Sequence, residues 1–549
     1  MKEKRLKDPL YGYIGIPADI MSDIVDSAAF QRLRRVTQTS YAPLYSSAVH
    51  NRFVHSLGVY NLGSIASHTL INEIKRKTNP GAINISEESF DIIKSTFLLA
   101  CLLHDVGHAP FSHTGEEFYL DVNHEYSQLH NLLIETVGSE QFKMDVPTNK
   151  SSSAAPHEIM SAIVGIKEYS DFFNTREERE FFARCITGYK YSCLTPENSI
   201  RNCFIQLLNS KVIDVDKLDY LIRDAYITGY NTVKIDYLRL LSSITIIDSE
   251  NENGEKKYEI AYYKGAISVI ENVVYAHDSE RKWIQNHPII LYECYLLQHI
   301  MKMLSENHDT DNNKLFSLES LSTNGNELND CGVIRLLSDD DIIHLAKRHY
   351  EENDFVKEYF DRRMRRHPLW KSEAEYKAFL LDVSSAGALI DSLENALKLT
   401  SDYLSRNIEN WLINENLVDR LKKELEEITH SGLDDRTKTA QEKDKRSILK
   451  VVECLINHAK SAGYSGDYVL LKASQFNSGF LKPDFSKIKI VFPTGAEDNV
   501  VLFSEKVSSI AGIGSERNNF FYLFYSRKEE NGESLDISKI CRELMREFI

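Results

Sequence analysis

The sequence predicts a mainly α protein that carries a small β-hairpin and an α/β appendix near its C-terminal end. Three observations support this fold class. Most of the first 300 residues place apolar side chains at intervals of three and four residues, which is typical of packed helices. The stretch 243–263 contains two β-rich runs around a polar turn, and the last 90 residues contain four short strand-like runs.

The elements are expected in the following order. Residues 23–36 and 89–107 read as helices, and the second is apolar nearly all round near its end, which predicts that this end is buried. The stretch 139–156 is polar with a serine cluster and is expected to be an exposed insertion. The hairpin 243–263 should turn at Asn253-Gly254, a pair that favours tight turns.

Length and loop composition predict the domain organisation. A chain of 549 residues with 42% hydrophobic residues can bury a large core and should divide into two or more domains. An Asn-, Asp-, Ser- and Gly-rich loop is expected to separate a catalytic core, 1–304, from a helical region, 330–460, that continues the core and has a hydrophilic break at 430–447. A small α/β subdomain is expected at 461–549, with strand-like runs at 468–473, 487–492, 500–503 and 520–525 and a closing amphipathic helix at 536–548.

Charge and hydropathy exclude several classes of function. The net charge of −16 argues against a generally basic surface, so nucleic acid is not an expected partner and any polyanionic ligand must meet a local basic pocket. The N-terminus has no signal-like apolar core, and the longest apolar run, Phe97–Leu103, is far shorter than the roughly 20 residues that span a bilayer. We therefore expect a cytoplasmic protein without a membrane partner. The eight cysteines form no CxxC pair, which indicates neither a disulfide framework nor a thiolate zinc site.

Two short stretches, "HNRFVHSLGV" at 50–59 and "LLHDVGHAPFSH" at 102–113, concentrate imidazoles and carboxylates. His104 and Asp105 follow a strongly apolar helix, where an unpaired buried carboxylate would be costly and a cation would offset the cost. Imidazole and carboxylate together suit Mn, Fe, Zn or Ni. His55 is the natural third ligand.

A fourth ligand is expected from "KVIDVDKLDYLIRDAYITGY" at 211–230, which carries four aspartates among apolar residues. Asp216 is the best candidate, since one helix would then present a metal ligand together with the Lys217 ammonium and the Tyr220 phenol. Each element has an ordinary alternative. The His-Asp pair can be a hydrogen-bonded core pair, and Arg52 can be a surface charge.

The motifs "HNRFVHSLGV", "HDVGHAPFSH" and "IDVDKLDYLIRD" resemble the HD-domain deoxynucleotide triphosphohydrolases, a group within the HD phosphohydrolases. The likeness extends to "DPLYGYIGI" and "FQRLRRVTQTS" and covers most of the chain, most densely up to about residue 230. It implies an HD-domain helical core, and four metal ligands at His55, His104, Asp105 and Asp216. It also implies that His108 and His113 contact the α-phosphate, with His113 as general acid, and that Glu116 orients His113 where close relatives have an aspartate.

The resemblance implies substrate contacts as well. Arg52, Lys217 and Tyr220 match phosphate-binding positions, whereas Gln38 and Asp224 match contacts to the deoxyribose 3′-hydroxyl. A further family histidine heads an H-E-x-x-S sequence. His157 fits that motif and is preferred, while His124 fits the usual distance along the chain.

By the same resemblance the activity is metal-dependent hydrolysis of deoxynucleoside triphosphates to deoxynucleoside and inorganic triphosphate. A Mg ion bridging the phosphates would accompany the cage metal. Asp26, Gln31 and Arg34 match an effector site for a dNTP or GTP, and can equally be the polar face of a helix. Relatives are homo-oligomers, so a dimer, tetramer or hexamer is expected, with a role in dNTP-pool control or antiviral defence.

Two rival functions remain open. One is another HD phosphodiesterase, acting on a cyclic dinucleotide or an alarmone. It is disfavoured by Arg52, Lys217 and Tyr220, and because the sequence lacks extra bridging histidines for a dinuclear site. The other is a non-catalytic nucleotide sensor or single-stranded nucleic-acid binder, which the full ligand set and His113 disfavour.

Overall fold

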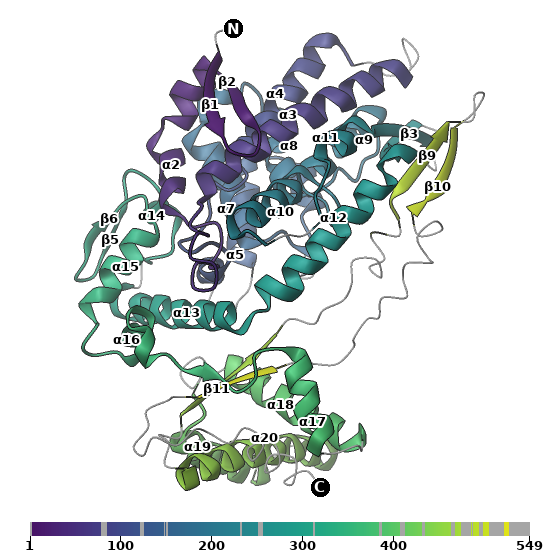
Figure 1. Ribbon diagram of the computed structural model, residues 1–549. Helices are drawn as coiled ribbons and strands as arrows, with labels where there is room; N and C mark the ends of the chain where they lie inside the picture. Colours follow the sequence, from purple (N-terminus) through teal and green to yellow (C-terminus); the bar gives the residue numbers. More distant parts are fainter. Residues whose placement is uncertain are drawn as a thin grey trace. The chain divides into compact units, whose positions relative to one another are not determined.

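The computed structural model confirms the mainly α fold class (Figure 1). It describes residues 3–77, 85–120, 126–147, 149, 152–230, 233–250, 256–310, 313–383, 387–406, 412–430, 434–462, 467–473, 485, 487–493, 498–503 and 521–525. The helices are α1 (Ala18–Ile20), α2 (Ala28–Gln31), α3 (Arg52–Lys77), α4 (Glu87–Leu103), α5 (Ser127–Val137), α6 (Glu140–Asp145), α7 (Pro156–Glu168), α8 (Arg176–Thr187), α9 (Pro196–Leu208), α10 (Val215–Thr228), α11 (Tyr237–Ser242), α12 (Ile267–Glu280), α13 (Pro288–His308), α14 (Leu318–Leu321), α15 (Asp339–Arg348), α16 (Asp354–Phe360), α17 (Glu373–Val383), α18 (Gly387–Arg406), α19 (Glu415–Thr429) and α20 (Asp435–Ala462).

The strands among the described residues form four small sheets. The sheet orders are β1-β2, β10-β9-β4-β3, β7-β11-β8 and β5-β6. The strands are β1 (Glu3–Asp8), β2 (Gly12–Pro17), β3 (Ile244–Glu250), β4 (Lys256–Tyr263), β5 (Asn326–Leu328), β6 (Gly332–Ile334), β7 (His367–Pro368), β8 (Tyr468–Lys472), β9 (Lys489–Pro493), β10 (Asp498–Leu502) and β11 (Phe521–Tyr525).

The chain divides into two compact units that interleave along the sequence. Unit 1 comprises Met1–Arg281, Leu297–Arg348 and Ser478–Ser515, and unit 2 comprises Lys282–Leu296, His349–Asn477 and Glu516–Ile549. This division cuts the chain at other positions than the domain boundaries expected from the sequence. Those boundaries stay a prediction.

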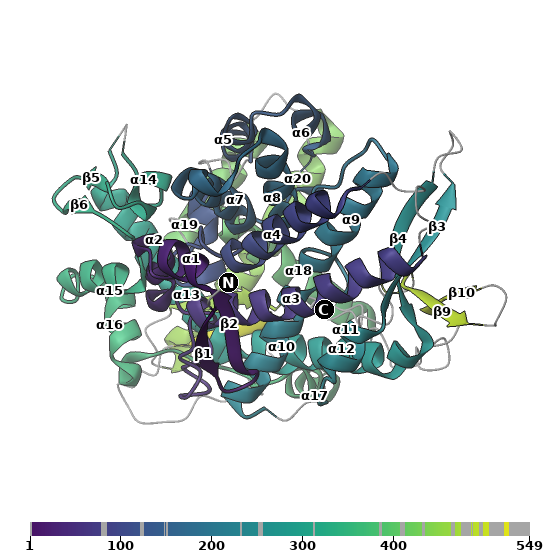
Figure 2. The same cartoon turned by 90° about the horizontal axis from the view of Figure 1, so that it is seen from above.

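Long helices form the core of unit 1. α3 packs against α4 and α10, and α4 also packs against α8 (Figure 2). The predicted burial at the end of α4 is confirmed, since Ala100 to Leu103 are fully buried. The helix predicted at 23–36 is instead broken into short turns, because Ser27 accepts a hydrogen bond from the Phe30 amide and starts a new helix there.

The β3–β4 hairpin confirms the prediction for 243–263, with Ile244 paired to Tyr262. Its expected turn, Asn253-Gly254, lies outside the described residues. The four C-terminal strand-like runs are confirmed as strands, but they divide between two sheets. β9 joins β4 in parallel and carries β10, whereas β8 and β11 pair with each other in unit 2 (Figure 1).

Two stretches differ from the elements expected of them. The stretch 139–156 contains helix α6, and Phe142 on it is fully buried, so this part is not an exposed insertion. Ser139 caps α6, and Phe142 supplies an apolar face for packing, which the polar composition around them obscured. The hydrophilic stretch 430–447 is largely helix α20, since its charged side chains favour an exposed helix over a loop.

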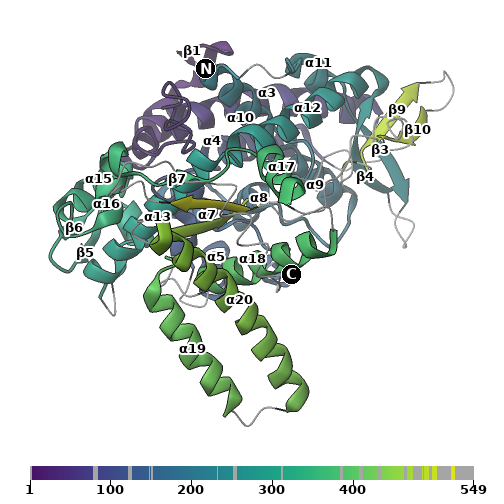
Figure 3. The same cartoon turned by 60° about the horizontal axis from the view of Figure 1, so that its bottom comes forward.

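Unit 2 has a hydrophobic core of its own. α18 and α19 pack against α20, and Figure 3 shows α19 and α20 as a helical hairpin. Leu417, Leu421 and Val452 face this core together with Tyr468 and Phe524 of the β7-β11-β8 sheet. The closing helix predicted at 536–548 lies outside the described residues.

Within the described parts of the chain, no helix is both long and apolar enough to cross a membrane. The structure places no disulfide among the seven cysteines that it describes.

Candidate active site

Three helix ends of unit 1 bring the predicted metal ligands together. His55 lies in the first turn of α3, whereas His104 and Asp105 directly follow the last residue of α4. Asp216 lies in the first turn of α10, whose N-cap Asp214 accepts a hydrogen bond from a backbone amide of the helix. Side chains separated by more than 100 residues therefore meet at one point.

Two glycines permit this close approach. A Cβ atom at Gly58 of α3 would lie 1.9 Å from Asp219 Oδ1 of α10, so only glycine allows the two helices to meet here. A Cβ atom at Gly107 would lie 2.4 Å from backbone atoms of Met160 and Ser161 on α7. Gly107 thus lets the chain after Asp105 turn tightly against α7.

The donor atoms of His55, His104 and Asp105 lie close enough together to hold one metal ion, and Asp216 Oδ1 lies near both imidazoles. His55 Nε2 lies 3.0 Å from Asp216 Oδ1, 3.3 Å from His104 Nε2 and 3.7 Å from Asp105 Oδ2. His104 Nε2 lies 3.5 Å from Asp105 Oδ1 and 3.7 Å from Asp216 Oδ1. We call His55, His104, Asp105 and Asp216 the cage.

These separations fit a bound divalent cation. Ligand atoms about 2.1 Å from a shared ion lie roughly 3.0 Å apart at octahedral angles and about 3.4 Å apart at tetrahedral angles. The separations of 3.0 to 3.7 Å in the cage cover both values. Two imidazoles and two carboxylates also form a donor set that suits borderline transition metals.

Both cage imidazoles are held so that Nε2 faces the other ligands. His55 Nδ1 lies 2.7 Å from Asp219 Oδ2, and His104 Nδ1 lies 2.9 Å from the Cys101 carbonyl oxygen. An acceptor at Nδ1 fixes the proton there and leaves Nε2 free to bind a metal. Asp219 was not among the predicted site residues, although its position three residues after Asp216 on one helix face is a usable signal.

Asp219 is itself held by three groups. Tyr11 Oη donates to Asp219 Oδ1 at 2.7 Å, and Arg223 donates to both carboxylate oxygens at 2.8 and 3.0 Å. Arg223 donates in addition to Asp8 at 3.0 Å. Buried charges are stable when paired in this way, so the network fixes the position of His55.

The cage has a negative potential that favours a cation. Burial lowers the pKa of His55, but hydrogen bonds to Asp216 and Asp219 outweigh this and raise the pKa to about 10. Burial raises the pKa of Asp105, yet Arg52 and the cage histidines hold it well below its usual range. The carboxylates are therefore ionised at neutral pH and attract a proton or a metal.

Three further histidines lie beside the cage, and we call them the outer histidines. The His108 ring stacks on the His157 ring at 4.1 Å between centroids, and the His113 ring lies 5.3 Å from His108 and 5.0 Å from His157. Neither His108 nitrogen has a hydrogen bond with a described residue, although Nε2 lies 3.4 Å from Asp105 Oδ1. Sequence reasoning preferred His157 over His124, and His124 lies outside the described residues.

Glu116 connects two of the outer histidines. Its Oε1 lies 3.4 Å from His113 Nδ1, and its Oε2 pairs closely with His157 Nδ1. Burial raises the pKa of Glu116, but His157 and His113 hold it well below its usual range. Burial lowers the pKa of His157, and Glu116 raises it to about 9. The carboxylate predicted for His113 alone is thus shared.

The loop between the cage and His113 has a strained backbone, which hydrogen bonds to Asp339 hold in place. Phe111 and Ser112 have φ angles of 55° and 54°, a left-handed conformation that costs free energy in residues other than glycine. Asp339 accepts hydrogen bonds from the Phe111 amide at 2.7 Å and from the Thr37 amide at 2.8 Å. Sequence reasoning missed Asp339, since it is more than 200 residues away and lies in no motif.

The predicted phosphate-binding cations have partners within the protein. Arg52 donates to Asp105 at 2.9 Å, to Ser112 at 2.8 Å and to the Gln38 carbonyl at 3.2 Å. Lys217 Nζ donates to Asp214 at 2.6 Å and to the Ser210 carbonyl at 2.7 Å. Arg52 therefore already lies at the cage, whereas the Lys217 ammonium is directed toward Asp214.

Gln38 and Asp224 are the predicted contacts to the sugar, and Tyr220 is a predicted phosphate contact. Gln38 is buried, and its Oε1 has no hydrogen bond with a described residue. Asp224 Oδ1 pairs with His50 Nε2 at 2.7 Å, a contact that sequence reasoning missed although His50 begins the first motif. Tyr220 is half-buried, and burial together with nearby carboxylates raises its pKa well above the usual value.

The predicted effector residues lie on the helical turns that precede Arg52. Gln31 donates to the Val25 carbonyl at 2.7 Å and accepts from Arg34 Nε at 2.8 Å. The Arg34 guanidinium lies 3.5 Å from the centroid of the Phe53 ring, and Asp26 pairs with Lys4 at 3.8 Å. These contacts satisfy the side chains locally, and the effector site stays a prediction.

Comparisons with known proteins were made for the sequence and for the structure. No family model matches the chain. An uncharacterized protein of Mycoplasma genitalium is 30% identical over 279 residues, which cover 50% of this chain and 53% of that protein. The deoxynucleoside triphosphate triphosphohydrolase SAMHD1 of Gallus gallus is 30% identical over 256 residues, 45% of this chain and 38% of that protein.

A protein of Acanthamoeba polyphaga mimivirus named for an HD domain is 26% identical over 306 residues, 54% of this chain and 56% of that protein. The chain thus spans about half the length of the curated relatives it matches. Two solved structures share the fold, and each is covered over 100% of its length. A hypothetical protein from Aquifex aeolicus has a TM-score of 0.53 at 19% identity and covers 99% of this chain. A phosphohydrolase from Bacteroides thetaiotaomicron has a TM-score of 0.52 at 17% identity and covers 96% of this chain. The sequence relatives at 26–30% identity thus include a deoxynucleoside triphosphate triphosphohydrolase and a protein named for an HD domain.

Proposed function

We propose that this chain is an HD-domain hydrolase that converts deoxynucleoside triphosphates to the deoxynucleoside and inorganic triphosphate. One observation carries the proposal: a four-residue cage that fits a divalent cation adjoins a histidine group linked to an ionised glutamate. A phosphoester hydrolase needs both parts, because the phosphoryl group must be polarised and the leaving oxygen must receive a proton.

His55, His104, Asp105 and Asp216 would hold an ion of the Mn, Fe, Zn or Ni type. When bound, this ion would supply Lewis acidity to the phosphoryl group and to a water nucleophile. A Mg ion bridging the substrate phosphates belongs to the same proposal. Asp219 and the Cys101 carbonyl would keep both imidazoles oriented toward the ion.

His113 is proposed to protonate the departing 5′ oxygen of the deoxynucleoside. Its side chain is 65% exposed and so is accessible to a substrate. The Glu116 carboxylate near Nδ1 favours a proton on that nitrogen, which leaves Nε2 to exchange its proton with the substrate. His108 and His113 are proposed to contact the α-phosphate, and His157, which pairs with Glu116, is a further proposed substrate contact.

Arg52 and Lys217 are proposed to offset the charge of the triphosphate. Arg52 needs no rearrangement, because its guanidinium already lies 2.9 Å from the cage carboxylate Asp105. Lys217 must turn away from Asp214 and Ser210 to reach a phosphate. Tyr220, half-buried on the next turn of α10, is the third proposed phosphate contact.

Gln38 and Asp224 are proposed to contact the deoxyribose 3′-hydroxyl. Gln38 Oε1 is buried and can accept a hydrogen bond from this hydroxyl, and Asp224 can do so if His50 releases one of its oxygens. Discrimination against ribonucleotides is proposed to come from packing of Gln38 and Tyr220 around the 2′ carbon, because rejecting an added hydroxyl requires a tight or unsatisfying pocket.

Regulation, assembly and cellular role are further parts of the proposal. A dNTP or GTP effector at Asp26, Gln31 and Arg34, a homo-oligomer, a cytoplasmic location and a role in dNTP-pool control or antiviral defence are proposed together with the activity, because the motifs of the chain resemble those of the HD-domain deoxynucleotide triphosphohydrolases. The dNTPs are therefore to be tested both singly and in mixtures.

Product analysis tests the proposed activity. The purified chain is incubated with each dNTP and Mn or Mg, singly and mixed, and products are separated by ion-exchange chromatography. We expect deoxynucleoside plus inorganic triphosphate, absent in the H104A/D105A variant and retained in H68A, whose exposed histidine lies further along α3. Release of monophosphate or diphosphate would contradict cleavage of the bond between the α-phosphorus and the 5′ oxygen.

A second candidate function is a dinuclear phosphodiesterase. The observation that favours it is the outer group itself, since His108, His113 and His157 have ligand atoms close enough to hold a second ion. This alternative predicts two bound ions per chain and hydrolysis of a cyclic dinucleotide. The same assays separate the two candidates, and nucleotide binding without any turnover would indicate a sensor.

A further inference from the structure

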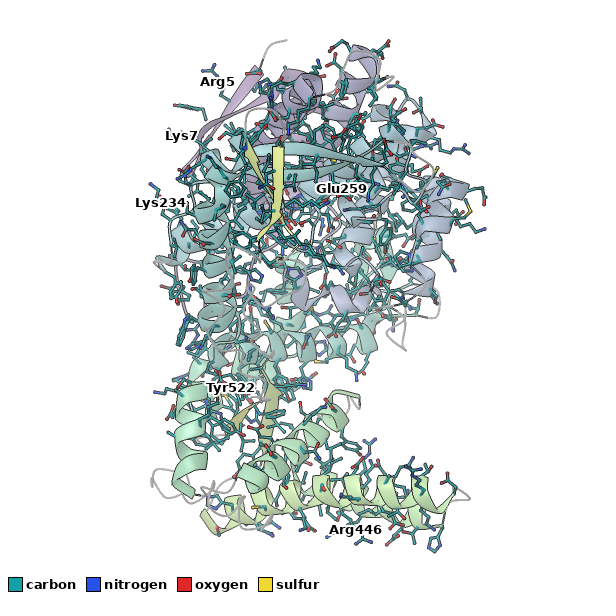
Figure 4. All side chains as sticks on the ribbon, turned by 90° about the vertical axis from the view of Figure 1, so that its right-hand side faces the viewer. Arg5, Lys7, Lys234, Glu259, Arg446 and Tyr522 are labelled. Carbon is teal, nitrogen blue, oxygen red and sulfur yellow. The ribbon has the colours of Figure 1, made fainter. Side chains whose placement is uncertain are left out.

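A separate cavity lies in unit 1, and neither the cage residues nor the outer histidines line it. It is a cavity of about 840 Å³ lined by α9, by the segments on either side of α9, and by β4 and β9. Five lysines line it, and we call it the lysine cavity. The lysines are Lys190, Lys211, Lys257, Lys487 and Lys489. Figure 4 shows Glu259, another lining residue, beside the C-terminal strands.

Positive charge exceeds negative charge in the lysine cavity. Glu158 and Glu259 are the acidic residues among those that line it, against five lysines. Glu259 pairs with Lys257 at 2.6 Å and closely with Lys489, so it is fully engaged. Glu158 accepts from Asn209 at 2.7 Å and from the Ala155 amide at 2.6 Å.

Three of the lysines form no salt bridge with a described residue: Lys190, Lys211 and Lys487. Lys190 Nζ donates to Gln206 at 3.2 Å, and the charge of Glu259, which already pairs with Lys257 and Lys489, also acts on it. Burial lowers the pKa of Lys190, Cys203 and Glu259 oppose this change, and Lys257 adds to it. In a chain of net charge −16, a concave group of unpaired lysines repels one another unless an anion joins them.

The other walls suit an organic anion. Tyr189, Tyr191, Tyr258 and Tyr262 line the cavity together with amide and hydroxyl side chains such as Asn202 and Ser199. Aromatic rings can cover a base or sugar, and the polar groups can orient it. A volume of 840 Å³ lies within the range of roughly 300–1,000 Å³ that is common for small-molecule sites.

One lining segment of the lysine cavity is joined to the candidate active site through the chain and through hydrogen bonds. Residues Ser210 to Ile213 line the cavity and directly precede α10. The Ser210 carbonyl accepts from Lys217 Nζ at 2.7 Å, and the Ser210 amide donates to Asp214 at 2.9 Å. Movement of this segment would therefore change the hydrogen bonds that hold Lys217 away from the cage.

We propose that the lysine cavity binds a polyphosphate, free or carried by a nucleoside, and that binding acts on the active site through residues 209–214. The binding site stands independently of the proposed hydrolase function, whereas the effect on catalysis rests on it. The anion bridges Lys190, Lys211 and Lys487 and draws Ser210 and Lys211 toward the cavity. Lys217 is then released from Ser210 and can turn to the substrate.

Isothermal titration of the full chain tests the binding site. ATP and inorganic triphosphate are the probes, in EDTA so that no divalent ion supports hydrolysis. We expect at least one probe to bind, and K190A/K211A/K487A to bind it at least about 10-fold more weakly, since each lysine makes a charge-assisted contact. The matched control K143A/K167A/K234A removes three exposed lysines elsewhere in unit 1 and should leave the affinity unchanged.

Each result supports or overturns the binding site. Binding of both probes means that the phosphates suffice, and binding of ATP alone means that the nucleoside is also recognised; both results support the proposal. Absence of binding, equal affinity in the cavity variant, or an equal loss in the control variant overturns it. Loss of dNTP hydrolysis in other assays with intact probe binding would count only against the proposed hydrolase.

Hydrogen exchange tests the connection to the active site without relying on turnover. Saturating probe should change the exchange of backbone amides in residues 209–217 of the wild-type chain. The K190A/K211A/K487A variant should show no change at the same probe concentration. Bound probe with unchanged exchange in this segment would overturn the connection and leave the binding site in place.

Discussion

The cage and the outer histidines are neighbours, yet the protein holds them in different ways. In the cage, His55 and His104 are buried and each has a fixed acceptor at Nδ1. In the outer group, His108 and His157 stack on each other, and His113 is 65% exposed and shares one glutamate with His157. The fixed imidazoles of the cage suit the proposed cation site, whereas the exposed His113 of the outer group suits the proposed proton transfer.

The largest expected effect comes from removing a cage ligand. Asp105→Asn removes one carboxylate and leaves the Arg52 charge without its partner, so both metal binding and hydrolysis should fall, by roughly 10³-fold or more in kcat/KM. Metal content by mass spectrometry and dNTP turnover measure the two losses. Asp91→Asn, at an exposed position of α4, is the control. Full metal content in D105N would contradict the cage.

A substitution in the outer group should separate the two functions. His113→Asn is expected to lower kcat by about 10²–10⁴-fold, the range for loss of a general acid, with metal content unchanged. The exposed His68→Asn serves as control. If H113N lost the metal together with activity, the outer group would be part of the metal site.

A smaller effect is expected from the support of His55. Asp219→Asn weakens the acceptor at His55 Nδ1 and should reduce metal affinity by about 10–100-fold. Asp8→Asn is the matched control, because Asp8 also pairs with Arg223 but does not contact His55. Metal titration of both variants measures the two affinities. Equal losses would mean that the effect passes through Arg223.

The smallest expected effect is a pH dependence of stability from the outer group. The pKa of His157 is raised from 6.5 to about 9, so its pair with Glu116 stabilises the fold fully below about pH 6.5 and loses this contribution as pH rises through 9. His157→Gln should abolish this part of the decline, roughly 2–4 °C in Tm. Thermal unfolding at pH 6 and pH 9.5 measures it.

His130 provides the control for this last prediction. Burial lowers the pKa of His130, so His130→Gln should change stability below about pH 6.5 and leave the decline toward pH 9 intact. A decline in H157Q equal to that of the wild-type chain would show that Glu116 does not hold a charged His157.

Much of the fold was predictable because it depends on local periodicity. The apolar spacing before His104 predicted a buried helix, and the structure has α4 there. The β-rich runs at 243–263 predicted β3 and β4. Ser27 and Phe142 show the limit of this reasoning, since one cap or one buried ring changes an element without changing the pattern around it.

In the candidate site, too, some residues could be predicted from the sequence and others could not. The motifs alone named His55, His104, Asp105 and Asp216, because each motif joins a chemically distinctive residue to an apolar helix end. The partners Asp219, His50 and Asp339 were missed, because their roles depend on which atom faces which neighbour. No sequence spacing encodes that contact.

The sequence by itself determined which helices form, that their ends carry imidazoles and carboxylates, and which residue types are available for a cation. Only the tertiary structure decided that Lys217 is directed toward Asp214, that Glu116 is shared by two histidines, and that Lys190 and Lys487 line one cavity. The physical reason is how far apart along the chain the interacting residues lie. Helix formation follows from neighbours a few residues apart, whereas pairing of charges between distant segments follows from how the helices and the β4–β9 sheet pack.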